Sequence, residues 1–349
     1  MGRTSCAWNG AFLLLLLSLP SCDSVSTKPL ETTMAGGDPE SLDWTIPNDQ
    51  SPLALLDSID AARLADLSPG RRAMLQRDLW MAFDKRRHSP PDDPVRERLA
   101  SLLRVLALPL DQIRSLPDPY VEAAKEYPSN YDPSKPDDPF LPPDLLDPEG
   151  RWVVLGGHGS ITVQHNSFFR WRSAFAVLVR HPSGRSATLK YVESLESQRL
   201  PEIPVGMEFA LLRRALLITD QGVPVVSPVT ETVQLRHYFG RNGDQQAVFK
   251  FELRRKDLQL HAIRPGERKP STAVSFEHLR SQKSLSVPVL DTCLACHGIG
   301  GPSGVGTFAF HASVDLHLRA SRLDQELQRT PPLKQADESW QQLIARWSR

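Results

Sequence analysis

Two cysteines and a histidine near the C-terminal end of the chain are the residues best suited to covalent and metal chemistry. They stand in the stretch Cys293-Leu294-Ala295-Cys296-His297. A pair of thiols at this spacing can bond covalently to a cofactor, close a disulfide or bind a metal ion, and imidazole is a common metal ligand. In a helical segment this spacing places both thiols and the imidazole on about one turn.

The pattern C-x-x-C-H is the attachment signature of c-type haem, whose vinyl groups react with the thiols while the imidazole binds the iron. The longer stretch "CLACHGIGG" resembles the opening of small soluble c-type cytochromes. The resemblance covers the motif and at most about the last sixty residues. It implies covalently bound haem c, with Cys293 and Cys296 as the thioether residues and His297 as the proximal iron ligand.

Three other interpretations of the pair remain open. A disulfide between Cys293 and Cys296 would remove little unfolded-state entropy, because the loop is so short. A thioredoxin-like redox pair should lie near a βαβ pattern, which the sequence does not show. A zinc site resembling a chaperone zinc domain would need four ligands from several repeats, and this chain has one.

The N-terminus reads "MGRTSCAWNGAFLLLLLSLPSC", a basic start followed by a short apolar run. This pattern predicts a secretory signal, because the run is too short to span a membrane. The end of the run, Leu19-Pro20-Ser21-Cys22, resembles the lipobox of bacterial lipoproteins. That resemblance implies acylation of Cys22 and anchoring to a membrane on the periplasmic or cell-envelope side. The alternative without lipid is an ordinary cleaved signal peptide followed by a cysteine that has no role in anchoring.

A second axial ligand for the iron has to come from elsewhere in the chain. No methionine follows Met207, so a His-ligated or open sixth position is expected. Three histidines are candidates: His311, His317 and His237. His311 is preferred because Phe308 and Phe310 precede it and because it lies close to His297 along the chain.

Composition limits the choice of partners. Lys plus Arg and Asp plus Glu both number 41, which gives zero net charge, and 40% of the residues are hydrophobic. A chain with these values buries a core, and without a basic stripe it is not expected to bind nucleic acid. The expected partners are a membrane, through the lipid anchor, and an unidentified redox protein.

Periodicity predicts an α+β protein with an N-terminal helical bundle, an antiparallel β domain and a short, mostly helical C-terminal haem segment. Helical spacing relates Leu99, Leu102, Leu103 and Leu106, and alternation marks strands such as "AVFKFEL". The stretch "AFAVLVRHPSGRSATLKYV" is interpreted as two strands around a turn. The predicted parts are a signal peptide (1–21), a lipidated tether (22–50), a helical region (51–127), a Pro-rich connector (128–150), an antiparallel β domain (151–260), a loop (261–285) and a c-type haem segment (286–349).

The sequence thus predicts an exported, lipid-anchored monohaem cytochrome whose simplest function is electron transfer, and it leaves open whether the protein is an enzyme. Two other functions stay open. An open sixth iron position would suit a haem enzyme or a redox or gas sensor. A Cys293–Cys296 disulfide without haem would leave an interaction lipoprotein whose sheet is the binding surface.

Overall fold

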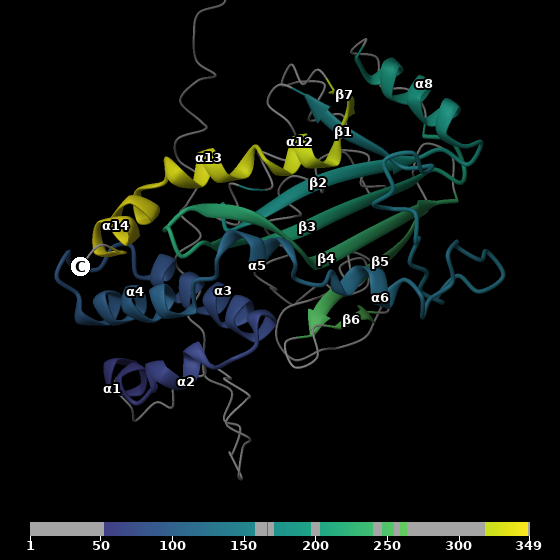
Figure 1. Cartoon of the computed structure of the whole chain (residues 1–349). Helices are drawn as coiled ribbons and strands as arrows, with labels where there is room; N and C mark the ends of the chain where they lie inside the picture. The colour runs from purple at the N-terminus through teal and green to yellow at the C-terminus, as the bar shows by residue number, and fades with distance from the viewer. Residues whose placement is uncertain are drawn as a thin grey trace, which may run out of the picture. The chain divides into compact units, whose positions relative to one another are not determined.

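The structure is a computed structural model that describes residues 52–157, 166, 171–196, 203–239, 246–254, 259–263 and 318–347. All of these residues belong to one unit of the chain, Leu42–Arg349. This unit contains both helices and an antiparallel sheet, so the protein is of the α+β class, as the sequence predicts (Figure 1).

Within the described residues, seven strands form one antiparallel sheet in the order β6-β5-β4-β3-β2-β1-β7. The first six strands are neighbours in chain order, and β7 returns from the far end of the chain to pair with β1. The strands are β1 (Val153–Gly157), β2 (Ser173–Arg180), β3 (Glu208–Ile218), β4 (Pro224–Tyr238), β5 (Gln246–Arg254), β6 (Gln259–Ile263) and β7 (Leu318–Ser321).

Within the described residues six helices precede the sheet in the chain, and two of them begin at an aspartate followed by proline. Asp93 accepts a hydrogen bond from the Val95 amide, and Asp118 accepts one from the Tyr120 amide. Proline suits the next position because the amide it lacks has no helical partner there. These helices are α1 (Pro52–Asp57), α2 (Ala61–Ala65), α3 (Pro69–Lys85), α4 (Pro94–Leu106), α5 (Leu110–Arg114) and α6 (Pro119–Ala123).

The predicted apolar face of α4 is confirmed, because Leu99, Leu102, Leu103 and Leu106 are all buried. They belong to the main core, together with Trp80 of α3 and Phe249 and Phe251 of β5. The alternation predicted for β5 is also confirmed, since Lys250 and Glu252 between the buried side chains stay half-buried.

The interpretation of residues 174–192 as two strands is wrong in its second half. Ser173–Arg180 is strand β2, but Arg185–Glu196 is helix α8. Tyr191, Val192 and Leu195 are buried against β1, β2 and β3, and their spacing places them on one side of a helix. The short run "ATLKYV" fits both the helical and the strand spacing of apolar residues. Packing against the sheet selects the helix.

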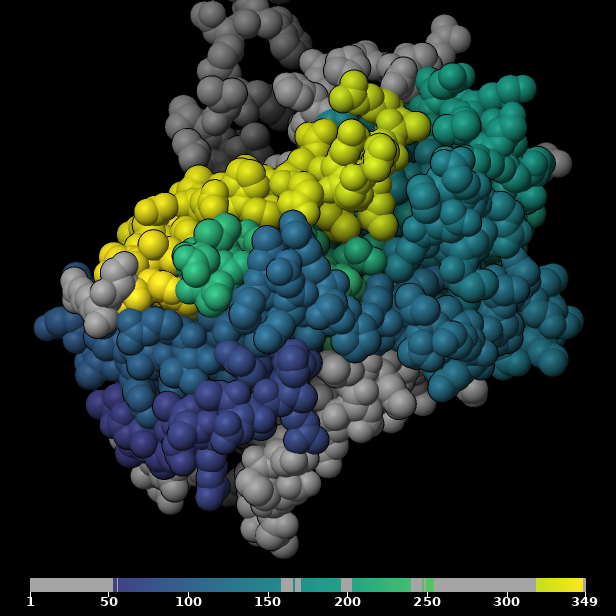
Figure 2. Space-filling model, viewed as in Figure 1, coloured from purple at the N-terminus to yellow at the C-terminus, as the bar shows by residue number. Residues whose placement is uncertain are grey.

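The C-terminal residues join the rest of the structure through both the sheet and the helices. β7 pairs with β1, and three helices follow it. The last of these, α14, packs against α3 and α4, which Figure 2 shows as the contact between yellow and blue surfaces. The three helices are α12 (Leu323–Leu327), α13 (Thr330–Gln335) and α14 (Glu338–Trp347).

Candidate functional site

The structure describes both ends of the segment that carries the cysteine motif. β6 ends at Ile263, β7 begins at Leu318, and these strands are the two opposite edges of the sheet. Six strand intervals of about 4.8 Å separate the edges by about 29 Å. Residues 264–317 therefore connect one edge of the sheet to the other. The predicted site residues lie outside the described residues: Cys22, Cys293, Cys296, His297 and His311.

His237, one of the histidines considered for the iron, is within the described residues and belongs to a row of charged side chains across three strands. Glu208 on β3 stands directly opposite His237 on β4 and directly opposite Arg180 on β2. The Nδ1 atom of His237 lies 2.9 Å from the Glu208 Oε1 atom, and the second carboxylate oxygen pairs with the Arg180 guanidinium. We call these three residues the Arg–Glu–His row.

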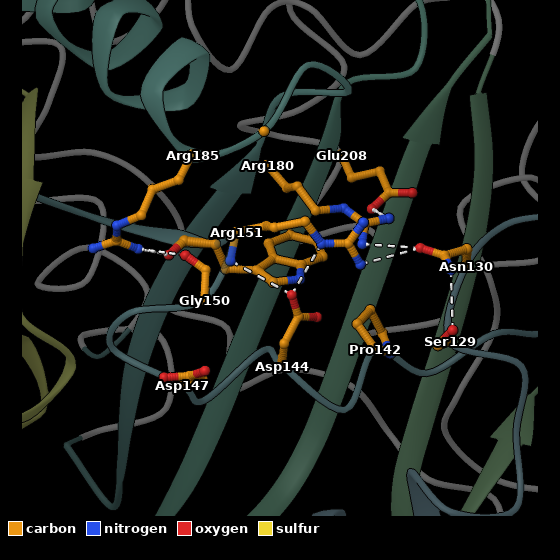
Figure 3. Close-up of polar contacts among 12 residues, drawn as sticks. Ser129, Asn130, Pro142, Asp144, Asp147, Gly150, Arg151, Arg180, Arg185 and Glu208 are labelled. Carbon is orange, nitrogen blue, oxygen red and sulfur yellow. Dashed lines mark hydrogen bonds and ion pairs between the residues drawn. The ribbon is translucent and has the colours of Figure 1, made fainter.

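The Pro-rich connector supplies the polar contacts next to this row. Arg180 donates a 3.3 Å hydrogen bond to the Asn130 side-chain oxygen, which also accepts one of 3.2 Å from Arg151. Figure 3 shows Asn130 facing Arg180 and Glu208 from the connector. The Arg180 guanidinium lies 5.1 Å from the centre of the Trp152 ring. The connector thus holds one end of the row in place.

Aromatic residues enclose the His237 imidazole. The Tyr131 ring stacks on it with centroids 4.1 Å apart and an angle of 23° between the planes. Phe140 meets Tyr131 edge to face, and Phe239, two residues beyond His237, is 41% exposed. The imidazole is therefore fixed by one hydrogen bond and one stacked ring, close to the surface at the end of β4.

Burial makes the charges of the row depend on one another. It lowers the pKa of the Arg180 guanidinium, and the Glu208 carboxylate opposes that effect. The Glu208 side chain is only 2% exposed, so its charge needs both neighbours as compensation. Because a carboxylate can only accept, the Nδ1 atom of His237 carries the proton in this hydrogen bond.

Met207, the one methionine that we considered able to reach the iron from the β domain, lies in a core. Its side chain is fully buried in the cluster that packs α8 against the sheet, with Tyr191, Val192 and Phe209 as members of the same cluster. A thioether packed in this way is a core residue.

A second charged cluster, which sequence reasoning missed, joins the C-terminal helices to α3. The Asp84 carboxylate accepts hydrogen bonds from Arg172 (2.9 Å), Lys334 (3.1 Å) and Ser339 (2.6 Å). Burial lowers the pKa of Arg172, and the Asp84 charge opposes this effect. Asp84 and Lys334 are both buried, and no local pattern marks either residue as a core residue, because charged side chains on helices usually face solvent.

A third buried carboxylate, Glu231, makes the stability of the protein depend on pH in the acidic range. Burial alone would raise its pKa, but Arg77, Arg213 and the Ser173 hydroxyl lower it below the ordinary value of 4.5. A carboxyl whose pKa is depressed by folding stabilises the native state above its unfolded pKa, and this contribution disappears as the pH falls through its folded pKa.

We therefore expect Glu231→Gln to flatten the loss of stability in acid. The free energy of unfolding of wild-type protein should fall as the pH drops from neutral to below 4.5, and the variant should lose less over the same interval. Urea titrations at a series of pH values measure this, with Glu122→Gln, an exposed carboxyl, as the control. If the free energy of unfolding fell with pH by the same amount in wild type and in Glu231→Gln, this role of Glu231 would be contradicted.

Comparisons with protein-family models, curated proteins and solved structures found no match to this chain. In the described part of the chain, no helix has the length and apolar character needed to cross a membrane. The same residues contain no group of three or more His, Cys, Asp or Glu side chains arranged to hold a metal ion.

Proposed function

We propose that the protein is an exported, lipid-anchored c-type cytochrome that carries one haem c and transfers electrons. The observation that carries this proposal is the complete Cys293-x-x-Cys296-His297 pattern behind an export signal. Once Cys6 is removed with the signal and Cys22 is acylated, the two motif cysteines are the remaining thiols of the chain. The proposal thus assigns a role to every cysteine of the mature protein.

Haem c supplies reversible one-electron chemistry at its iron. In this proposal Cys293 and Cys296 hold the haem covalently, and His297 supplies the proximal imidazole. The described residues contribute the frame, since β6 and β7 fix the two ends of the motif segment to one sheet. An imidazole whose other nitrogen binds a carboxylate is also a donor type suited to iron, and His237 is such a residue.

Two measurements separate this proposal from the alternatives. Haem staining of a denaturing gel distinguishes a cytochrome from an interaction lipoprotein with a Cys293–Cys296 disulfide, which does not stain. Carbon monoxide added to the reduced, haem-loaded protein then distinguishes an electron-transfer site from an enzyme or sensor. Rapid binding would show an open iron and would favour the enzyme or sensor.

The lipid anchor gives a prediction about location. We expect Cys22→Ala to move the protein from the membrane fraction to the soluble fraction, because the acyl chains supply the membrane affinity. Fractionation followed by immunoblotting measures the distribution, and Cys6→Ala, a change within the signal, is the matched control. Retention of Cys22→Ala in the membrane with unchanged processing would show that the anchor is wrong.

We also propose that α1–α6 form the N-terminal helical bundle expected from the sequence, with α4 at its centre. This is supported by the contacts that α1, α2 and α3 each make with α4. Arg98 of α4 ties α1 and the turn that follows it to α4 by donating hydrogen bonds to the Leu56 and Ile59 carbonyls. Native-state hydrogen exchange in which α3 and α4 open independently would contradict a cooperative bundle.

A further inference from the structure

We propose that the layer formed by helices α3, α4 and α14 binds a small inorganic monoanion such as chloride, with the Arg96 guanidinium as its main ligand. Arg96 belongs to α4, and α14 packs against both α4 and α3 (Figure 1). Three features of Arg96 support this site: its burial, its hydrogen-bonding atoms and the charges around it. The site does not depend on the proposed haem.

Arg96 is buried in the helical layer, where its guanidinium lies over an aromatic ring. The residue is 1% exposed, and its Cζ atom is 4.2 Å from the centre of the Phe83 ring of α3. The ring attracts the cation and covers one face of the guanidinium. The N–H groups point outward in the plane of the guanidinium, so they still need acceptors.

One edge of the guanidinium is free to bind a ligand. The Nε and Nη2 atoms of Arg96 are buried and have no hydrogen-bond partner among the described residues. These two atoms form the side edge of the rigid guanidinium fork, so a single acceptor can bind both of their N–H groups. A buried donor without an acceptor is costly, and such groups in proteins indicate an ion or a water molecule that completes the hydrogen bonds.

The carboxylates near Arg96 are each bonded to another cation. The pairs are Asp93 with Arg86 (2.8 Å), Glu97 with Arg346 (2.7 Å) and Asp84 with Lys334 (3.1 Å). Burial lowers the pKa of the Arg96 guanidinium, the Arg346 charge lowers it further, and these three carboxylates oppose both effects. The pKa stays below its ordinary value, so the carboxylates compensate the Arg96 charge only in part.

The balance of charges around Arg96 determines the class of ligand. Three cations face two carboxylates, and they are Arg86, Arg96 and Arg346 with Asp93 and Glu97. The neighbouring cluster is balanced, because its two cations meet two carboxylates: Arg172 and Lys334 with Asp84 and Asp337. One positive charge is therefore in excess. A monoanion compensates it, whereas a dianion would bring a second charge that must itself be desolvated.

Chloride suits this edge better than water does. It accepts hydrogen bonds without bringing a donor that would need an acceptor of its own, and its charge compensates the Arg96 guanidinium. A water molecule accepts as well, but it brings two O–H groups and leaves the charge unbalanced. A ligand that binds the folded protein and not the unfolded chain stabilises the fold by mass action, so stability should depend on the chloride concentration.

Urea unfolding of purified full-length protein tests the site, at one pH and one ionic strength, with chloride exchanged for the much larger anion gluconate. The folding equilibrium constant of wild type should rise, approaching about tenfold for each tenfold increase in chloride above its dissociation constant. Arg96→Met should abolish this dependence. In gluconate this variant should be at least as stable as wild type, because it removes a buried charge that is not fully compensated. Arg63→Met, at a side chain that is 87% exposed, is the matched control and should keep the dependence.

A second variant and a second measurement make the test independent of how well methionine is accommodated. Arg96→Lys keeps the charge but not the fork, so it should bind chloride more weakly than wild type. Folded wild type and Arg63→Met should broaden the NMR line of chloride, and Arg96→Met should not. Wild-type stability that does not change with chloride would overturn the proposal in favour of water. Equal chloride dependence in Arg96→Met and wild type would show a general salt effect and would overturn it too.

Discussion

Replacing both motif cysteines, Cys293→Ser with Cys296→Ser, should abolish covalent haem completely. A serine hydroxyl does not form the thioether bond to the porphyrin, so the double variant retains no covalent link. Intact mass should then show the chain without the mass of one haem, and the stained band on a denaturing gel should disappear. We expect a complete loss because Cys293 and Cys296 are the only thiols that the proposal assigns to the cofactor.

Cys22→Ala is the matched control for this experiment. It also removes a cysteine, but one that the proposal assigns to lipid, so the exported protein should still stain for haem. Expression should use cells that mature another c-type cytochrome in the same culture. An unstained wild-type band beside a stained reference cytochrome would refute haem attachment, and the disulfide alternative would then apply to Cys293 and Cys296.

Asp84→Asn should produce the largest loss of stability among single changes at charged residues. The amide keeps the shape of the carboxylate but removes the negative charge that compensates Arg172 and Lys334. Both cations are largely buried, and breaking a buried ion pair by removing one partner costs about 3–5 kcal/mol. Urea unfolding of purified protein measures the change in the free energy of unfolding.

The exposed pair of Lys125 and Glu122 supplies the matched control. Glu122→Gln makes the same chemical change in a pair that solvent screens, and its effect should be close to zero. Combining Asp84→Asn with Lys334→Met should recover part of the loss, because the double variant no longer holds in the core an ammonium group that has lost one of its two carboxylate partners, Asp84, and keeps only Asp337. A loss in Asp84→Asn no greater than that in Glu122→Gln would contradict the role of the cluster.

The Asp84 cluster also matters for the proposed cytochrome. Lys334 and Ser339 lie beyond the motif in the chain, and their bonds to Asp84 tie them to α3 near the start of the described residues. Together with the pairing of β7 with β1, these bonds fix the chain on the C-terminal side of the motif. The return to the sheet of the segment that carries the motif therefore depends on contacts that the motif itself does not contain.

Local patterns in the sequence were sufficient for the elements whose buried side chains lie a few residues apart. The leucines of α4 and the alternating phenylalanines of β5 were predicted correctly, because helix and strand periods appear directly in the order of residues. The C-x-x-C-H pattern is also local, and its role in binding haem remains a prediction.

The tertiary structure decided the contacts between residues far apart in the chain. His237 and Glu208 meet across 29 positions, and Lys334 and Asp84 across 250. Such pairs depend on strand register and helix packing, and a shift of one residue in the register of β3 and β4 would turn Glu208 to the other face of the sheet. Helix α8 was mistaken for a strand because its short apolar run fits both periods, and only the sheet beneath it selects the helix.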